Sequence, residues 1–339
     1  MIDIKLLEQL CLCNGISGDE GNVRNLIINE IKDCADDIKT DNLGNLIVFK
    51  KGKKSAKSKL MVSAHMDEVG LMVTDITSDG YLKFDEVGGI DRRVLPGKRV
   101  CVGRNGLNGV IGVKPIHLTN GDEKTAVPKM NDMYIDIGAE SREDALKYVN
   151  YGDGINFEGD FKINSKTVVT KALDDRFGCY VLINLIKSEP EYDMYFTFVV
   201  QEEVGLRGAR PAAFTVNPDF ALVIESTTAA DVAEVDASHQ VCNLSKGATV
   251  TVMDRATVYD KEMISAAFEL AEKNNISVQY KRAVAGGNDS GAIHQSRGGV
   301  RTLAVSLPSR YIHAPSTAAN LDDCESVLKL AKILSDYIA

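Results

Sequence analysis

The sequence of 339 residues contains no tryptophan, few aromatic residues (6%) and no excess of positive charge. It has no stretch long and apolar enough to span a bilayer, and residues 1–8 lack the basic segment and apolar core of a signal peptide. The net charge of −9 argues against nucleic acid or an anionic membrane surface as the main partner. We therefore expect a cytoplasmic protein that binds neither nucleic acid nor a membrane.

Cysteine is scarce and irregularly spaced. The seven cysteines are an odd number, and no two of them have the CxxC spacing of a redox motif or a zinc knuckle. Reduced thiols in a cytosol are the simplest interpretation. A disulfide framework and a structural zinc site are not indicated.

Hydrophobic residues (44%) and charged residues (26%) are present in the proportions of an ordinary globular protein, and the length allows one or two domains. Apolar, β-branched runs predict buried strands of a central, mostly parallel sheet. These runs cover 46–49, 60–64, 195–200, 220–224 and 302–307. Amphipathic patterns at 261–274 and 321–338 predict helices, so the fold class is α/β with helices on both faces of the sheet.

Residues 71–166 have a different pattern of apolar and turn-forming residues. Short alternating runs are separated by Gly, Asn and Asp turns, and the only helical pattern is a short one near 143–148. This pattern is typical of a small all-β domain. We expect it to be inserted into a discontinuous α/β domain made of residues 1–70 and 167–339.

Five of the segments share one feature, a His or a carboxylate at or just after an apolar run. The residues are His65 with Asp67, Asp174, Glu202 with Glu203, Glu225, and His313. Ligands of open α/β sheets bind beyond the carboxyl ends of the strands. Because side chains alternate along a strand, Glu202 and Glu203 can share a site only where the strand has become a loop, and Gly205 favours such a break.

Taken singly, each of these residues has an ordinary interpretation. Glu202 and Glu203 can be solvated loop residues, and Asp174 with Asp175 can cap a helix. Ser17 and Glu20, three apart, predict a capping box before a helix with Val23 on its buried face. Together, however, the carboxylates would repel one another at one edge of a sheet unless a divalent cation, or a pair, were bound. Histidines and carboxylates without cysteine indicate Zn²⁺, Co²⁺ or Mn²⁺ in a hydrolase.

In this order the residues resemble the M42 family of metallo-aminopeptidases, within the co-catalytic zinc peptidase group. The matching motifs cover nearly the whole chain: Gly15-Ile-Ser-Gly-Asp-Glu20, Ala64-His-Met-Asp-Glu-Val-Gly70, Lys171-Ala-Leu-Asp-Asp-Arg176, Val200-Gln-Glu-Glu-Val-Gly-Leu-Arg-Gly-Ala209 and Arg310-Tyr-Ile-His313. The resemblance implies a central sheet covered by helices and an inserted β-barrel-like domain. It also implies removal of N-terminal residues from short peptides.

The resemblance assigns a role to each site residue. Asp174 would bridge two divalent metal ions, Zn²⁺ or Co²⁺ with Mn²⁺ as a further candidate. His65 and Glu203 would serve one ion, and Glu225 and His313 the other. Glu202 would be the general base that activates a water bridging the two metals, and Asp67 would orient His65.

The chain departs from the family pattern at three places. Glu225 stands where the family usually has Asp, which adds a methylene to a metal ligand. The motif Gly287-Asn-Asp-Ser-Gly291 differs from the Thr-Asp-Ala sequence that the family usually has in this loop. The segment His313-Ala-Pro-Ser lacks the acidic residue that often follows the proline in the family. Relatives use the inserted domain to form dimers and tetrahedral dodecamers, so homo-oligomerisation and control of substrate access are expected of residues 71–166.

Three alternatives remain open from the sequence. The same site can act as a metal-dependent deacylase or other amidohydrolase. A glycoside hydrolase needs two carboxylates flanking a sugar and would leave the histidines unused, and the absence of Trp argues against it. A non-catalytic binding module is the third, if Glu225 has disabled the second metal site. His117, His239 and His294 are expected to be structural or exposed.

Overall fold

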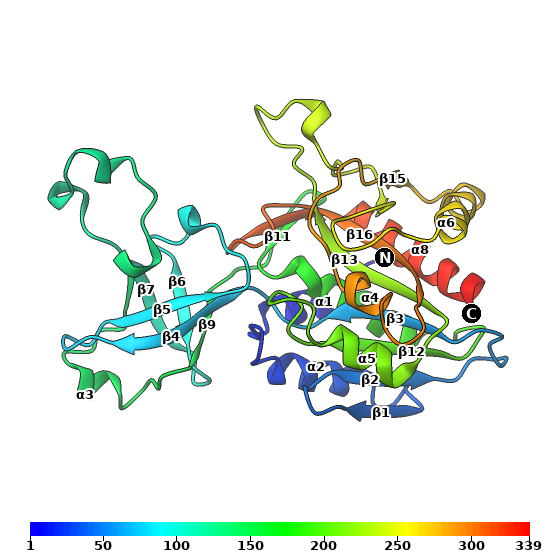
Figure 1. The fold of residues 1–339 in the computed structure, drawn as a ribbon, viewed down its shortest axis with the longest axis horizontal. Coiled ribbons are helices and arrows are strands. Elements are labelled where there is room, and N and C mark those ends of the chain that lie inside the picture. The colour runs from blue at the N-terminus through cyan, green and yellow to red at the C-terminus, as the bar shows by residue number, and fades with distance from the viewer.

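The computed structural model describes residues 1–339, apart from the side chain of residue 123. The chain forms a large α/β body and a smaller β-barrel beside it, connected by short chain segments near the middle of the view (Figure 1). The predicted fold class is therefore confirmed, including the inserted all-β unit.

The helices and strands follow one another along the chain as follows. The helices are α1 Ile4–Leu12, α2 Gly21–Ile31, α3 Arg142–Ala145, α4 Leu173–Lys187, α5 Ala209–Val216, α6 Lys261–Lys273, α7 Ser290–Ile293 and α8 Leu321–Ile338. The strands of the large sheet are β1 Asp37–Thr40, β2 Leu46–Lys50, β3 Leu60–His65, β10 Lys162–Asn164, β11 Thr167–Thr170, β12 Met194–Val199, β13 Phe220–Thr228, β14 Ala248–Val250, β15 Val278–Tyr280, β16 Arg301–Arg310 and β17 Thr317–Asn320. The barrel strands are β4 Gly70–Ile76, β5 Leu82–Val87, β6 Arg99–Val102, β7 Leu107–Gly112, β8 Tyr134–Asp136 and β9 Gly154–Phe157.

Four parallel strands form the centre of the large sheet, in the order β12-β3-β13-β16. The flanking strands are antiparallel: β2 pairs with β12, and β17 pairs with β16 and with β11. The complete sheet is thus mixed: four of the five predicted apolar runs form its parallel part, whereas the run at 46–49 forms the antiparallel strand β2. Because parallel strands point the same way, their carboxyl ends lie at one edge.

Helices cover both faces of this sheet, and alternate residues of β3 show how. Val62 packs in a large core with α1, α4 and α8, whereas its neighbour Met61 packs in a second core with α5 and Ile293 of α7. Side chains of consecutive residues point to opposite faces of a strand. The continuous apolar runs of the sequence are therefore the result of burial on both faces.

The six barrel strands close into a ring in the order β4-β5-β8-β7-β6-β9, with a separate hydrophobic core. β10, at 162–164, belongs to the large sheet and pairs with β11. The division of the chain at residues 71 and 166 stays a prediction, with the barrel strands lying between Gly70 and Phe157.

The N-terminal turn at residues 14–20 packs where the chain crosses from the sheet into the barrel. A Cβ at Gly70, the first residue of β4, would lie 2.2 Å from Ile16 Cγ2 and 2.8 Å from the Ile155 carbonyl oxygen. Only glycine lets the backbones approach so closely. This contact fixes the barrel against the edge of the sheet at which the central strands end.

A fully buried arginine, Arg176, ties this crossing to the N-terminus. Its guanidinium donates to the carbonyl oxygens of Leu10, Cys13, Gly15 and Met66 and lies 3.2 Å from Glu68 Oε1. Glu68 also accepts from the buried ammonium of Lys171 at 2.6 Å. The guanidinium of arginine has five N–H donors fixed in one plane. No other side chain can donate to so many acceptors at one site.

Replacing Arg176 with Met is expected to lower the free energy of unfolding by about 3–5 kcal/mol, because it leaves carbonyls and part of a buried charge without a partner. The measurement is urea denaturation in the presence of chelator. As a matched control, Lys187→Met removes the half-exposed ion pair with Glu30 and is expected to change stability by less than about 1 kcal/mol. Equal shifts in the two variants would contradict this interpretation of Arg176.

Candidate metal centre

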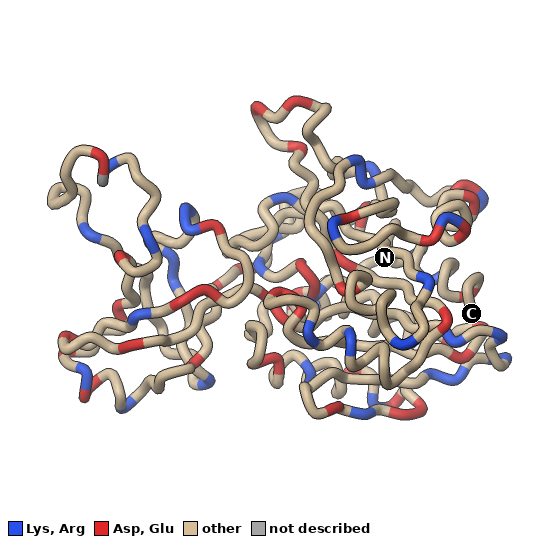
Figure 2. The backbone as a smooth tube through the Cα atoms, viewed as in Figure 1, with Lys and Arg blue, Asp and Glu red and all other residues tan. Residues whose placement is uncertain are grey.

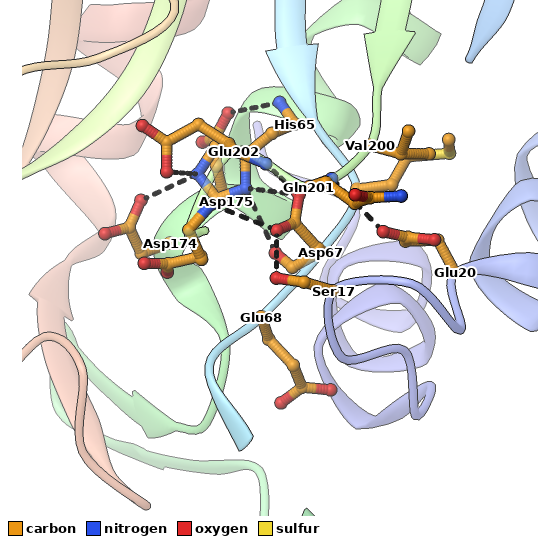
Figure 3. A network of polar contacts seen from close by, with 12 residues as sticks. Ser17, Glu20, His65, Asp67, Glu68, Asp174, Asp175, Val200, Gln201 and Glu202 are labelled. Carbon is orange, nitrogen blue, oxygen red and sulfur yellow. Dashed lines mark hydrogen bonds and ion pairs between the residues drawn. The ribbon is translucent and has the colours of Figure 1, made fainter. Parts of the chain in front are cut away.

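The predicted site residues meet at the carboxyl edge of the central strands. His65 ends β3, Glu202 and Glu203 follow β12, and Glu225 lies in β13. Asp174 stands at the start of α4, and His313 follows β16. Figure 2 shows acidic segments gathered where the large body meets the barrel, and Figure 3 shows part of the cluster from close by.

One group forms around the buried ring of His65. His65 Nε2 lies 3.4 Å from Asp174 Oδ1, 3.6 Å from Glu225 Oε2 and 4.0 Å from Glu202 Oε2. Asp174 and Glu225 each offer an oxygen that, with the His65 nitrogen, forms a compact set of potential ligand atoms. Three such atoms match the number that one catalytic metal takes from a protein.

A second group forms around His313. Its Nε2 lies 3.3 Å from Glu203 Oε2 and 3.5 Å from Asp174 Oδ2, and the three residues form another compact set. Asp174 therefore directs one oxygen to each group. A third compact set joins His65 with Glu202 and Glu203, so Glu203 can serve the His65 group, as the resemblance implies, or the His313 group, while Glu225 lies with His65.

Unsatisfied buried atoms indicate that the cluster is built for cations. Asp174 Oδ1 and Glu225 Oε1 are buried and have no hydrogen-bond donor among the residues that the structure describes. Buried carboxylates without donors are strongly disfavoured unless a metal or another cation neutralises them. The residues present thus fit a pair of divalent ions, with His nitrogen and carboxylate oxygen as ligands and no cysteine.

The pKa values of the clustered side chains reflect the same close spacing of buried negative charges. Burial, and then the like charges of Asp289 and Glu203, raise the pKa of Glu202 well above its usual value. Burial likewise raises the pKa of Glu203 to about 7. Burial alone would lower the pKa of His65, but the carboxylates of Glu225 and Asp174 raise it well above the ordinary value. A bound cation would favour the ionised carboxylates and the neutral imidazoles that coordinate metals.

Asp67 organises the loop that carries the two glutamates (Figure 3). Its carboxylate accepts from the backbone N–H of Glu202 at 3.0 Å and of Glu203 at 3.1 Å, and it is fully buried. His65 Nδ1 lies 3.0 Å from the carbonyl oxygen of Asp67 and 3.5 Å from its carboxylate. Asp67 thus contacts both the histidine that it was predicted to orient and the backbone of both glutamates.

The predicted capping box of Ser17 and Glu20 is wrong. The hydroxyl of Ser17 donates to Asp67 at 2.6 Å, and α2 begins after Glu20 without a side-chain cap. Glu20 instead accepts from the backbone N–H of Gln201 at 3.1 Å and of Gly18 at 2.7 Å. Long-range bonds to the glutamate loop, which the sequence does not reveal, replace the local helix cap.

Three further residues near the site were not predicted as functional. Asp289 is fully buried, neither of its oxygens has a described hydrogen-bond partner, and burial raises its pKa to about 7. Asp175 accepts from the backbone N–H of His65 at 3.3 Å and of Gly178 at 2.9 Å. Lys281 lines the cavity beside the cluster. In the sequence, the motifs around these three residues could not be distinguished from ordinary turn and helix-start patterns.

The barrel closes one side of the site. A Cβ at Gly88, just after β5, would lie 3.2 Å from Glu203 Cβ, and Gly89 approaches the ring of His313. On the other side a cavity of about 310 Å³ opens from the cluster, within the size range of small-ligand sites. The centre therefore lies between the two units, with room for a small molecule beside it.

The remaining histidines lie apart from the cluster. His117 and His239 are exposed in short 3₁₀ turns, and His294 Nδ1 contacts the carbonyl oxygen of Ser290 at 2.7 Å. None of them joins a potential ligand group among the described residues. All seven cysteines are free thiols.

Comparison with known proteins agrees with this geometry. The sequence model of the M42 glutamyl aminopeptidase family matches residues 44–330. The chain belongs to the M42 peptidase family. A relative from Acetivibrio thermocellus, provisionally assigned as an aminopeptidase, is 43% identical over 96% of each chain. The lysyl aminopeptidase of Pyrococcus furiosus is 34% identical over 100% of this chain and 98% of the relative.

Solved structures of TET peptidases have the same fold. The TET aminopeptidase of a marine-sediment Thaumarchaeota archaeon superposes with a TM-score of 0.93 at 33% identity, covering 98% of this chain and 95% of the other. The Pyrococcus horikoshii TET1 peptidase, which can assemble into a tetrahedron or a large octahedral shell, gives 0.86 at 40% identity, covering 98% of each chain. This M42 peptidase is thus a metal-dependent peptide hydrolase, and none of its described helices meets the length and hydropathy needed to cross a membrane.

Adding Zn²⁺ or Co²⁺ to the chelator-treated protein is expected to raise its unfolding temperature, because ions that bind only the folded state stabilise it. At a free-ion concentration of 100 times the dissociation constant the stabilisation is about 2.7 kcal/mol per site. Differential scanning calorimetry measures the shift.

Two histidine variants make the test specific to the cluster. His313→Ala removes a proposed ligand and should reduce the shift, whereas His239→Ala changes an exposed histidine outside every ligand group and should leave it unchanged. An equal shift in both variants, or no shift in the parent protein, would count against the metal centre.

Proposed function

We propose that this M42 peptidase is a di-metal aminopeptidase that removes N-terminal residues from short peptides. The observation that carries the proposal is Asp174, which directs one carboxylate oxygen to the His65 group and the other to the His313 group. A carboxylate in that position can bridge two ions. Two-metal sites are common among aminopeptidases.

Two of the three compact groups support one division of the ligands. His65 and Glu225 would hold one ion, His313 and Glu203 would hold the other, and Asp174 would be shared. When bound, such ions lower the pKa of a water molecule and polarise the scissile carbonyl group. Zn²⁺ and Co²⁺ suit these ligands best, and Mn²⁺ is a further candidate.

Glu202 is the residue proposed to move the proton. It lies at the edge of the His65 group, with Oε2 4.0 Å from His65 Nε2, and it lines the cavity. As a general base it would take a proton from the attacking water and transfer it to the leaving amine. Its backbone N–H donates to the carboxylate of Asp67 at 3.0 Å, which holds the residue beside the proposed ligands.

The barrel supports a proposal about assembly. A groove of about 830 Å³ lies in the barrel unit at residues 96–132, beside Ile116 and Leu118, whose exposed fractions are 71% and 56%. Apolar side chains so exposed are typical of interfaces. We therefore propose that the chain forms homo-oligomers through the barrel, which would restrict the site to short peptides.

Replacing Glu202 and Glu203 with Gln, one at a time, separates the two proposed roles. Glu202→Gln should retain bound metal and lower kcat by about 10²–10⁴-fold, because only the proton acceptor is lost. Glu203→Gln should weaken metal binding first. Metal content by atomic emission and turnover on the same samples distinguish them, and full activity in Glu202→Gln would disprove the assignment of the base.

The reaction class is tested with a set of substrates. We expect release from unblocked aminoacyl-nitroanilides and dipeptides to stop in chelator and to return with Zn²⁺ or Co²⁺. Activity indifferent to chelation would overturn the metallopeptidase mechanism. Faster cleavage of N-acetylated substrates than of their free-amine counterparts would instead support a deacylase on the same site.

A further inference from the structure

The motif Arg310-Tyr-Ile-His313 contains an arginine that the proposed mechanism does not use. Arg310 is the last residue of β16, and His313 lies three residues further on, in the turn 311–316 before β17. The guanidinium of Arg310 donates twice to one carboxylate: Nε lies 2.7 Å from Asp231 Oδ1, and Nη2 lies 2.9 Å from Asp231 Oδ2. Two parallel bonds of this kind fix the orientation of both side chains as well as their distance.

Asp231 is itself held in place. It belongs to the loop 229–244, which projects from the large body between β13 and β14 (Figure 1). Its Oδ2 also accepts from the backbone N–H of Leu244 at 2.9 Å, and the carbonyl oxygen of Ala229 accepts from the N–H of Val241 at 3.0 Å. The two ends of the loop are therefore tied together, and the arginine meets a fixed partner.

The segment that carries His313 has little support of its own. The side chain of His313 is 39% exposed, whereas that of His65 is 1% exposed. His65 Nδ1 contacts the carbonyl oxygen of Asp67, but Nδ1 of His313 has no hydrogen-bond partner among the residues that the structure describes. Metal-binding histidines are usually oriented through this second nitrogen.

The backbone of the same segment is in an unfavourable conformation. Tyr311 and His313 have φ angles of +61° and +57°, which residues other than glycine adopt only when their surroundings hold them there. At its far end the turn is held by β17, which pairs with β11 and β16. At its near end it is held by Arg310, whose side chain is bound to Asp231.

We infer that Arg310 and Asp231 are positioning residues for the metal centre, because their ion pair holds the backbone from which His313 reaches its ligand group. The inference rests on the proposed di-metal function and deepens it. Without the pair, the turn would have to be ordered when the metal binds, and that ordering would reduce the affinity. The pair therefore pre-organises one ligand of the site.

The effect should be confined to the His313 side of the centre. His65 ends β3, and Glu225 lies within the register of the paired strands β13 and β16. Their backbone positions are fixed by sheet hydrogen bonds and do not depend on the ion pair. Loss of the pair should therefore weaken one metal site and leave the other.

Two other roles for the pair give different results. A purely structural pair would stabilise the metal-free fold, although its side chains are 34% and 9% exposed and such pairs contribute little. Alternatively, the pair could shape the cavity beside the centre, which Val241 and Ile312 line from the two segments that it joins. In that case KM would change while metal binding stayed the same.

The test is calorimetric titration of the chelator-treated protein with Co²⁺, for which the parent should show two binding events. His313→Ala identifies the event that depends on this histidine. Arg310→Met and Asp231→Asn should each weaken the same event about 10–100-fold and leave the other within about threefold. The double variant should be no weaker than either single one, because both changes remove one interaction. Arg310→Lys, which keeps the charge without the two parallel bonds, should fall between.

The matched control lies on the same strand. Arg301, at the opposite end of β16, makes the same bidentate contact with Asp260 at 2.7 and 3.0 Å. Arg301→Met should keep both binding events at the parent affinity. In chelator, the unfolding temperatures of Arg310→Met and Arg301→Met should agree within about 3 °C. A much lower temperature for Arg310→Met would show a general structural role and overturn the inference.

Crystal structures of the chelator-treated variants provide a readout independent of metal. In the parent, His313 Nε2 lies 3.3 Å from Glu203 Oε2 and 3.5 Å from Asp174 Oδ2. We expect Arg301→Met to keep this position and Arg310→Met to lose it. An unchanged His313 in Arg310→Met, equal weakening of both binding events, or a raised KM with both events intact overturns the inference. A parent that binds fewer than two Co²⁺ ions per chain would instead overturn the proposed di-metal centre, and the crystal structures would still decide what positions His313.

Discussion

The structure depends on the concentration of buried negative charge at one edge of the sheet. Asp174, Glu203 and Glu225 share this edge with two imidazoles, and buried oxygens of Asp174 and Glu225 have no described donor. Such an arrangement opposes folding unless cations enter it. The parallel strands bring the carboxylates together, and the metals would make their proximity favourable, so the fold and the proposed chemistry share one requirement.

Asp67 converts that cluster into a site with divided roles. Two consecutive glutamates cannot point the same way along a strand, and here the strand has ended at Val199, with Gln201 at a φ of +57°. Asp67 then binds the backbone of both glutamates, and Ser17 and Glu20 hold Asp67 and Gln201 from the N-terminal turn. The positions of the glutamates are therefore set by backbone contacts, which leaves their carboxylates available for the proposed roles in metal binding and proton transfer.

The sequence predicted what depends on local pattern. The apolar runs that became β3, β12, β13 and β16 were recognised, and so were the barrel texture and the residues at the strand ends. The short strands β1 and β17 were missed because pairing with a neighbour, not propensity, makes them strands. Ser17, Asp289 and Lys281 were missed as site residues for a similar reason. The partner of Ser17 lies 50 residues away, the oxygens of Asp289 have no described partner, and Lys281 meets the cluster only through the folding of distant segments, so single-sequence patterns carry no such information.

Glu225 shows how the scaffold tolerates a departure from the family pattern. Its register against Ser306 in the paired strands β13 and β16 fixes its Cα, so the added methylene must be taken up by the side chain alone. The carboxylate nevertheless reaches 3.6 Å from His65 Nε2 and joins the ligand group of His65 and Asp174. Glu has one more rotatable bond than Asp, so fixing its side chain in one position costs more conformational entropy. The position of Glu225 therefore supports the proposal that it can serve as a metal ligand together with His65 and Asp174.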